Sequence, residues 1–493
     1  MAEEREDENQ FRAARMAKLE ELRRLGVDPY PSGFARTATA KELEERYAAL
    51  PAGAETADHV AVAGRIRALR NSGMFIDLHD SSGKIQVFNH KSQLPAEQMA
   101  LIRLLDLGDI IGVEGVVRRT PRGELTINGR TLAVLAKALL PLPEKYHGLA
   151  DIETRYRQRY LDLIMSEESR LTLRRRSQVI AGLRRLLVER GFLEVETPML
   201  HAIPGGASAK PFITHHNALD LDLYLRIAPE LHLKRLLVGG LSERLFEINR
   251  CFRNEGLSPR HNPEFTSLEL YEAYVDYRAM MELAEALIAQ VAEEVLGTTR
   301  IVYAGRAIEL KAPWPRKSMA ELVRDATGMD FLAMDDKTAR AEARRLGVEL
   351  RDTAGWGRAL EGAFAATVEA ELIEPVHIIG FPREISPLAK PDPGDARLTE
   401  RFESYINGWE VANAFSEIND PQDQLARFAA QMRERELGDE EAQRLDEDFI
   451  AALEYGMPPA GGLGIGIDRL VMLLTGSASI RDVIAFPTMR PRG

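Results

Sequence analysis

The sequence contains a single cysteine, Cys251, among its 493 residues. A lone cysteine excludes an internal disulfide and any zinc site built from several thiolates. Cys251 stands between Arg250 and Phe252, so we expect its thiol to be a small buried filler rather than a nucleophile.

Long hydrophobic runs are missing as well. No apolar run approaches the ~18 residues that a membrane-spanning helix needs. The N-terminal stretch, MAEEREDENQ, is acidic and lacks the apolar core of a signal peptide. With 45% hydrophobic and 28% charged residues, the composition is typical of soluble globular proteins, and we expect a cytoplasmic protein without a membrane partner.

The common glycine-rich nucleotide-binding motifs are absent too. There is no P-loop GxxxxGK(S/T), and in GGLGIGIDRLVMLLTG the third glycine of a GxGxxG turn is replaced by Arg469. Instead, Gly462, Gly464 and Gly466 alternate and leave one face of an expected strand without side chains, where a flat or bulky group can approach the backbone. Arg469 then follows in an apolar helix beside this bare face; a close strand–helix packing contact is the alternative.

The net charge is −12, so the chain as a whole is not basic. Charge is nevertheless uneven, because residues 60–140 contain eleven Lys and Arg against seven Asp and Glu, a local excess of four positive charges. This excess is a modest indication that the segment has a polyanionic partner.

The chain length predicts about two to four domains. Residues 8–50 have helical spacing, with stops at Gly26 and Pro51. Residues 60–140 then predict about five short alternating strands, with a helical stretch at 96–105 between the third and the fourth. This pattern suits a small β-barrel of the OB type, and a generic β-domain without a ligand is the alternative.

Beyond a proline-containing linker, LLPLPEKYHGLAD, we expect a long amphipathic helix at residues 169–190 and a strand in GFLEVETPML that ends at Pro198. The remainder mixes helices with strands. The expected organisation is a helical extension at 1–55, a barrel at 56–142, a linker at 143–165 and a larger domain at 166–493 that contains a helix-rich insertion at about 275–380.

The stretch RNEGLSPRHNPEFTSLELYEAY, residues 253–274, is unusually rich in charge for a loop followed by a strand. Gly256, Pro259 and Pro263 predict the loop. The strand that follows has period two and places its leucines on one face, while the opposite face carries Phe265, Ser267, Glu269 and Tyr271. The segment is either an edge strand with a solvated face or the floor of a site whose loop cations hold an anion.

Three segments, in order along the chain, resemble the signature motifs of class II aminoacyl-tRNA synthetases. GFLEVETPML resembles motif 1, FRNEGLSPRHNPEFTSLE resembles motif 2, and GLGIGIDRLVMLL resembles motif 3. Within this class, IPGGASAKPF, APELHLKR, ELYEAY and EVANAFSEIND most closely resemble the lysyl-tRNA synthetases. The resemblance covers nearly the whole chain. It implies an α+β fold in which an OB-fold anticodon-binding barrel precedes a catalytic domain with a mostly antiparallel sheet flanked by helices.

The residue types support lysine as the substrate independently. A cationic side chain needs carboxylates at the bottom of its pocket. Glu269 and Tyr271 share one strand face, and Asn413, Phe415 and Glu417 share another. If the two strands are neighbours in a sheet, Glu269 and Glu417 can flank an ammonium group, whereas an aspartate-selective site would need cations there. The resemblance adds further lysine-binding residues, of which the first two contact the α-amino group: Gly206, Glu230, Arg253 and Gly464.

The resemblance also implies an ATP site. Arg253 and Arg469 are the expected catalytic residues, with Arg253 on the α-phosphate and the substrate carboxylate, because a guanidinium fork suits such oxygens. Phe265 is expected to stack on adenine, with Arg469 on the other face of the base. The remaining expected ATP contacts are Glu255, Arg260, His261, Asn262 and Glu403.

Glu403 and Glu410 match the family's magnesium ligands, which implies about two to three Mg2+ ions as cofactors with ATP. Either carboxylate could instead be merely solvated. Glu410 has the opposite strand parity to Asn413, so we expect a bulge nearby, with Ala412 as the candidate position.

In the barrel, the resemblance implies that the Phe75 ring stacks on an anticodon base and that the Gln86 amide reads a base edge. A barrel-core position is the alternative for Phe75; Arg70 and Glu124 complete the expected anticodon residues. The implied partners are tRNA(Lys), L-lysine, ATP and a second copy of the chain, joined through motif 1. Two other functions stay open: a catalytically inactive or moonlighting synthetase-like regulatory protein, and a lysylating enzyme for another acceptor such as elongation factor P.

Overall fold

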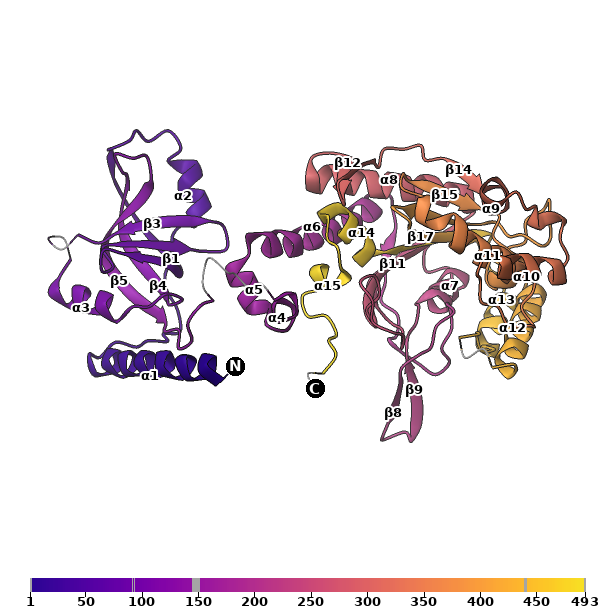
Figure 1. Ribbon diagram of the computed structural model, residues 1–493, viewed down its shortest axis with the longest axis horizontal. Coiled ribbons are helices and arrows are strands. Elements are labelled where there is room, and N and C mark those ends of the chain that lie inside the picture. Colours follow the sequence, from indigo (N-terminus) through magenta and orange to yellow (C-terminus); the bar gives the residue numbers. More distant parts are fainter. Residues whose placement is uncertain (1, 91, 93, 144–150, 439–440, 492–493) are drawn as a thin grey trace. The chain divides into compact units, whose positions relative to one another are not determined.

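The computed structural model describes residues 2–90, 92, 94–143, 151–438 and 441–491. The chain forms two compact units, Met1–Ala150 and Asp151–Gly493 (Figure 1). Among the helices of the described residues, none combines the length and the apolar character needed to cross a membrane.

The N-terminal unit is built around a closed five-stranded barrel with the strand order β1-β2-β3-β5-β4. Ile76 and Leu78 alternate with outward-facing residues along β2 and point into the apolar barrel core. The barrel and the helix between its third and fourth strands confirm the OB-type expectation. The elements of this unit are α1 (Ala2–Arg24), α2 (Ala40–Arg46), β1 (Glu55–Arg70), β2 (Phe75–His79), β3 (Lys84–Phe88), α3 (Ala96–Leu104), β4 (Ile110–Arg119) and β5 (Leu125–Ala136).

The larger unit is organised by an eight-stranded sheet in the order β14-β15-β16-β17-β18-β11-β10-β6. Neighbouring strands are antiparallel except for the pairs β14–β15 and β10–β6, which confirms the mostly antiparallel expectation. The strands of this sheet are β6 (Leu193–Glu194), β10 (Arg244–Phe252), β11 (Glu264–Ala273), β14 (Arg316–Ser318), β15 (Val376–Ile379), β16 (Arg401–Ile406), β17 (Trp409–Ser416) and β18 (Ala460–Gly466).

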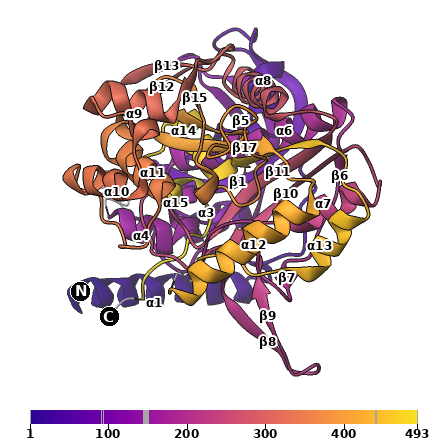
Figure 2. The same ribbon diagram turned by 90° about the vertical axis from the view of Figure 1, so that its right-hand side faces the viewer.

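Helices cover both faces of the sheet. Leu268 and Leu270 of β11 point to one face, where α6, α8 and α14 form the main apolar core. Tyr271 and Phe415 belong to the opposite face, which packs against α7, α12 and α13. Figure 2 shows α8 on one side of the sheet and α12 and α13 on the other. The helices named here are α6 (Glu167–Glu189), α7 (Glu230–Val238), α8 (Tyr277–Leu296), α12 (Pro421–Glu436), α13 (Glu447–Glu454) and α14 (Ile467–Thr475).

The remaining elements lie at the margins of this sheet. Strands β8 and β9 form a hairpin that projects from the rest of the unit (Figures 1 and 2). These remaining elements are α4 (Ile152–Arg157), α5 (Arg159–Met165), β7 (Leu200–His201), β8 (Ile213–His216), β9 (Leu221–Leu225), β12 (Arg300–Tyr303), β13 (Arg306–Glu309), α9 (Met319–Thr327), α10 (Asp336–Arg345), α11 (Trp356–Thr367) and α15 (Ile480–Val483), with short 3₁₀ turns at Phe331–Ala333, Glu369–Glu371 and Arg383–Ile385.

The organisation differs from the sequence expectation in three places. Residues 152–165 of the expected linker form α4 and α5, which are anchored to the second unit because buried Arg159 donates hydrogen bonds to carbonyls near the C-terminus; residues 144–150 of that linker lie outside the described residues. The motif 1 strand is short, because only Leu193–Glu194 pairs in the sheet. Within the stretch 275–380, α8 belongs to the main core and β15 to the sheet, while α9, α10 and α11 form a separate apolar cluster.

Candidate active site

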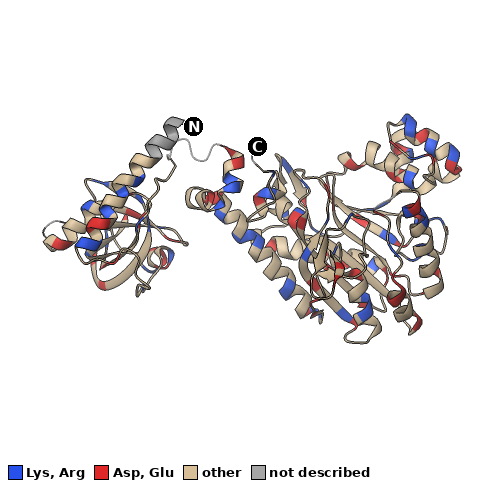
Figure 3. Cartoon of the chain, turned by 90° about the horizontal axis from the view of Figure 1, so that it is seen from below, with Lys and Arg blue, Asp and Glu red and all other residues tan. Residues whose placement is uncertain are grey.

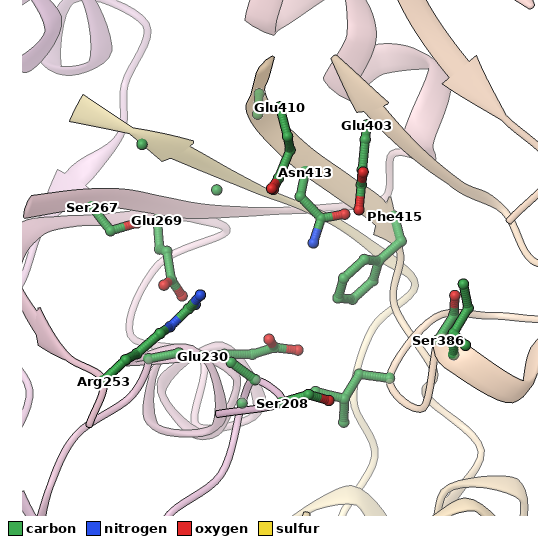
Figure 4. Close-up of a pocket in the computed structure, with 18 of the residues that line it drawn as sticks. Ser208, Glu230, Arg253, Ser267, Glu269, Ser386, Glu403, Glu410, Asn413 and Phe415 are labelled. Carbon is green, nitrogen blue, oxygen red and sulfur yellow. The ribbon is translucent and has the colours of Figure 1, made fainter. Parts of the chain in front are cut away.

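A cavity of about 560 Å3 lies on the sheet face opposite α8. Every residue that the sequence analysis placed in the lysine, ATP and magnesium sites lines this one cavity. Figure 4 shows Glu230, Glu269 and Phe415, from three separate elements, turned toward the same space. The fold therefore brings together side chains from α7, the 253–263 loop and the strands β11, β16, β17 and β18.

The glycine-rich strand β18 lies between the strand that carries Glu269 and the strand that leads to Glu417. We expected the strands of Glu269 and Glu417 to be neighbours if the acids were to meet, but β18 lies between β11 and β17. In register, Tyr271 pairs with Gly462, and Gly462 pairs with Phe415. A Cβ atom on Gly462 would lie 2.0 Å from Oε1 of Glu417 and 2.6 Å from Cε1 of Tyr271. Because the middle strand has no side chains there, residues two strands apart reach one another across it.

Three carboxylates converge on this part of the cavity. Glu230, at the start of α7, and Glu417, directly after β17, are 6% and 1% exposed. Glu269, on β11, is half-buried and lines the same cavity. Burial raises the pKa of Glu269 to about 8, helped by the nearby charge of Glu230 and opposed by Arg253. Buried acids that repel one another have high affinity for a cation. A bound cation neutralises their negative charge, which is poorly solvated away from water.

The sequence analysis missed one cation in this cluster, Lys234. Its side chain is fully buried, its Nζ lies 2.5 Å from Oε1 of Glu230, and it also forms an ion pair with Glu417. The Lys234 Nζ lies 5.3 Å from the ring centroid of Phe415 and 5.8 Å from that of Tyr271. The signal was present in APELHLKR, because Glu230 and Lys234 are four residues apart and share one helix face.

The motif 2 arginine lies in the cavity wall beside an aromatic ring. The Arg253 guanidinium lies 5.1 Å from the ring centroid of Phe265, and its buried Nε has no hydrogen-bond partner among the described residues. A buried guanidinium with an unused donor is suited to bind an anion. Arg260 lies over Trp409 at 5.8 Å.

Arg469 lines the cavity beside Glu410 and His261. We expected its guanidinium to lie parallel to Phe265, on the far side of a base. In the structure it donates hydrogen bonds to the carbonyl and carboxylate of Glu410, at 2.8 and 3.2 Å, and to Nε2 of His261, at 3.1 Å. The pairing follows from the proximity of Glu410, since an arginine pairs with a nearby carboxylate, and the place of Arg469 on adenine stays a prediction.

Two other expected nucleotide contacts have contrasting surroundings. Asn262 is 7% exposed; its amide nitrogen donates to the carbonyl of Glu264, and its amide oxygen accepts from the backbone of Thr488. These bonds hold the 253–263 loop to the C-terminal segment. Glu255, in the same loop, is exposed at the cavity rim.

Glu403 and Glu410 both face the cavity (Figure 4). Burial and the neighbouring charge of Glu410 together raise the pKa of Glu403 to about 7, so the two acids lie close enough to repel. The Arg401 guanidinium donates a hydrogen bond to Glu403 at 2.5 Å, and the Tyr405 hydroxyl donates one to Glu403 at 2.7 Å. Sequence reasoning missed both contacts, although Arg401 and Tyr405 share the strand face of Glu403. Among the described residues no cluster of three or more His, Cys, Asp or Glu side chains is arranged to hold a metal ion.

The bulge expected near Ala412 is present, one residue earlier. On β16 the pairing passes from Ser404, opposite Ala412, to Tyr405, opposite Glu410, so Val411 is the extra residue. The bulge reverses the parity of the strand. As a result, Glu410 reaches the same cavity as Asn413.

In the barrel, the four expected anticodon residues share one outer face. The strand pairing places Arg70 beside Phe75, and Gln86 beside Thr126, two residues from Glu124. Phe75 is half-buried, lies outside the apolar core, and stacks on Phe88 with ring centroids 4.9 Å apart. Gln86 is 9% exposed and accepts a hydrogen bond from Thr126. Arg70 pairs with Asp77 at 2.6 Å and Glu124 with Lys84 at 2.7 Å.

Comparison with known proteins is consistent with both units. Residues 151–490 match the family described as tRNA synthetases class II (D, K and N), and residues 60–135 match the OB-fold nucleic acid binding domain. A protein of Rhizobium meliloti (strain 1021) named lysine–tRNA ligase is 57% identical over 479 residues, which cover 97% of this chain and 96% of the relative. A protein of Carboxydothermus hydrogenoformans with the same name is 54% identical over 99% of this chain and 100% of the relative. The chain therefore belongs to the class II tRNA synthetases of the D, K and N group.

Proposed function

We propose that this protein is a lysine–tRNA ligase, which activates L-lysine with ATP and transfers the lysyl group to the 3′ end of tRNA(Lys). The observation that carries the proposal is the convergence of Glu230, Glu269 and Glu417 across the glycines of β18. Two buried acids and the half-buried Glu269 suit an amino acid with two ammonium groups, because they would repel an acidic side chain and a neutral side chain would leave them unpaired. The name shared by the relatives agrees with this substrate.

Activation joins two anions, the carboxylate of lysine and the α-phosphate of ATP. A carboxylate oxygen attacks the α-phosphorus, the bond from that phosphorus to the pyrophosphate oxygen breaks, and pyrophosphate leaves. Arg253 has a buried Nε without a partner among the described residues and lies in the cavity wall between Glu269 and Phe265. We assign to it the neutralisation of both anions as they meet. The carboxylate is already ionised at neutral pH, so the residues act by positioning and charge rather than as a general base.

The nucleotide half of the cavity is the side that carries Phe265, His261 and Arg469. The Phe265 ring offers a stacking surface, and Arg469 holds His261 in place through a hydrogen bond to Nε2. The same bond leaves the His261 Nδ1 to contact Ser258 at 2.8 Å. Arg260 and Glu255, both exposed at the rim, complete the proposed ATP contacts.

Glu403 and Glu410 would hold Mg2+ that enters with ATP. The donor set fits, because two mutually repelling carboxylates offer hard oxygen ligands and a divalent cation relieves their repulsion. About two to three such ions would neutralise charge on the phosphate oxygens. Arg401 and Arg469 keep the two acids directed into the cavity.

The barrel would bind the anticodon of tRNA(Lys). The outer face of β1, β2, β3 and β5 combines an accessible aromatic ring, Phe75, with the Gln86 amide, which suits stacking and base-edge hydrogen bonding. Figure 3 shows Lys and Arg interleaved with Asp and Glu on this unit, so stacking and hydrogen bonds would contribute alongside charge.

A second copy of the chain would pack on the motif 1 segment. Leu193, Met199 and Leu200 in this segment are 43%, 37% and 46% exposed, an unusual density of accessible large apolar side chains in a short stretch. We propose a cytoplasmic homodimer joined there.

The first test is the exchange of labelled pyrophosphate into ATP, measured separately in the presence of each of the 20 amino acids. The second test is the charging of tRNA(Lys) with lysine. Exchange with lysine alone, and lysylation of the tRNA, is the expected result. Absence of exchange would identify a binding or regulatory protein instead. Exchange without tRNA charging, but with lysylation of elongation factor P, would identify the other acceptor.

A further inference from the structure

Lys234 in α7 is a fully buried ammonium group inside the proposed lysine site, and the mechanism above does not use it. It contacts Glu230 at 2.5 Å and Glu417, and the rings of Phe415 and Tyr271 enclose it. Burial disfavours its charge, but the two carboxylates outweigh burial and hold the pKa of Lys234 above its ordinary value. The side chain is therefore a permanent cation among the acids that would receive the substrate.

We propose that Lys234 is a positioning residue for lysine, a bridge between Glu230 and Glu417 that sets both the charge and the orientation of the acids for a substrate with two ammonium groups. The inference rests on the proposed lysine specificity. It assigns a role to a residue of this chain beyond those that would contact the substrate.

The first argument is charge balance. When a bound cation keeps Glu230, Glu269 and Glu417 ionised, the three carboxylates and the ammonium group of Lys234 leave two negative charges. L-Lysine brings two ammonium groups, and its carboxylate would pair with Arg253. The nearby Arg226 and Glu247 are paired with each other at 2.7 Å and add no net charge. A buried site is most favourable when every charge has a partner. Lys234 provides the positive charge that makes the number of positive groups equal to the number of negative groups once lysine is bound.

The second argument is orientation. Lys234 contacts one oxygen of Glu230 and Oε2 of Glu417. The other oxygen of Glu417, Oε1, has no hydrogen-bond partner among the described residues and is directed at the bare backbone of Gly462. The bridge thus occupies one side of each acid and leaves the other side facing the cavity. Because Glu230 and Lys234 sit four residues apart on one rigid helix, the bridge also fixes Glu417, which is held by no helix of its own.

The experiment compares wild-type protein with Lys234→Met in lysine-dependent pyrophosphate exchange. Methionine keeps the length and apolar stem but removes the charge. We expect the KM for lysine to rise by roughly tenfold or more, since two buried carboxylates lose their partner, while the KM for ATP and kcat change by less than about threefold. Lys317→Met is the matched control, because Lys317 is an exposed lysine of β14 in the same unit. Its KM for lysine should equal that of wild type.

A charge-matched pair of variants separates a positioning role from a merely structural one. Glu230→Gln alone leaves one net negative charge in the cluster, whereas Glu230→Gln combined with Lys234→Met restores two. Adding the second substitution to the first should therefore improve lysine use, lowering the KM for lysine by roughly threefold or more. If Lys234 serves only as a structural ion pair, the double variant should instead have a higher KM for lysine than Glu230→Gln alone. This comparison also applies if the Lys234→Met single variant does not fold, because the double variant removes both members of the Glu230–Lys234 pair.

Each outcome has a distinct meaning. If wild-type protein shows no lysine-dependent exchange, the proposed function fails and the Lys234 inference fails with it. If wild type is active and folded Lys234→Met keeps its KM for lysine, or lowers it, the substrate's own ammonium groups replace Lys234, and the inference is overturned while the function stands. The inference is likewise overturned if the double variant is worse than Glu230→Gln alone.

Discussion

Replacing Gly462 with alanine would add one methyl group beside Glu417 and Tyr271 in the proposed lysine site. Gly462 is not among the glycines with positive φ, so alanine can adopt its backbone conformation and only the space around it matters. The added Cβ would meet Glu417 Oε1 at 2.0 Å and Tyr271 Cε1 at 2.6 Å, whereas ordinary contacts begin at 3.4 Å. Glu417 would have to move by more than 1 Å, away from the position in which Lys234 holds it.

The size of the effect follows from this overlap. Forcing a methyl group into a packed interior costs about 1–3 kcal/mol. If that cost falls on the lysine-bound state, the KM for lysine rises by roughly 5- to 150-fold. The KM for ATP should change much less, because Glu417 and Tyr271, which a Cβ on Gly462 would meet, are not among the proposed ATP contacts. Part of the overlap strain would also lower the melting temperature of the variant.

Lysine-dependent pyrophosphate exchange measures both KM values, and Gly464→Ala supplies the comparison. A Cβ on Gly464 would meet nothing closer than 3.7 Å, so the same methyl group, two residues along the same strand, fits without moving a neighbour. We expect a clearly smaller rise in the KM for lysine than with Gly462→Ala. If the two variants behave alike, or if Gly462→Ala keeps the wild-type KM, the idea that bare backbone at Gly462 defines the lysine site is wrong.

Four further measurements address the rest of the site. Glu417→Gln should weaken lysine binding by on the order of 2–5 kcal/mol, since it neutralises a buried ion-pair partner, and unchanged lysine kinetics would refute the ammonium role. The pKa of Glu269 is about 8 in the folded protein and about 4.5 unfolded, so its contribution to stability is present below pH 4.5 and is lost as the pH rises through 8; saturating lysine should therefore raise the melting temperature more at about pH 8.5 than at about pH 6.5, and equal shifts would contradict this. Ornithine, shorter by one methylene, should be disfavoured only about 10- to 200-fold in kcat/KM, but norleucine more strongly, because it leaves buried carboxylates unpaired; a preference for norleucine over ornithine would exclude the acid cluster. Phe75→Ala should raise the KM for tRNA by the equivalent of about 1–3 kcal/mol of lost stacking and leave pyrophosphate exchange unchanged, and a matching loss of exchange would show that Phe75 serves folding instead.

Much of the fold and the site followed from sequence patterns that act locally. Period-two alternation in 265–271 separated a leucine face from a polar face, and the structure keeps that division, with Leu268 and Leu270 in the main core and Glu269 in the cavity. The alternating glycines of β18 marked a face without side chains. The parity conflict at Glu410 predicted a bulge, found at Val411 rather than Ala412.

Sequence reasoning failed where the answer depended on which elements become neighbours. It made the meeting of Glu269 and Glu417 conditional on neighbouring strands, whereas the acids meet although β18 lies between those strands; strand order is set by crossovers and packing over long distances in the chain. It left Lys234 in a helix pattern without a role.

By itself, the sequence determined which residues of a strand or helix share a face and which chemical groups are available, since these depend on φ, ψ and side-chain period within a few residues. Only the tertiary structure decided that the acids meet across a strand of glycines and enclose a lysine of the same chain. That arrangement depends on contacts between segments nearly 200 residues apart, from Lys234 to Glu417, which no local pattern encodes.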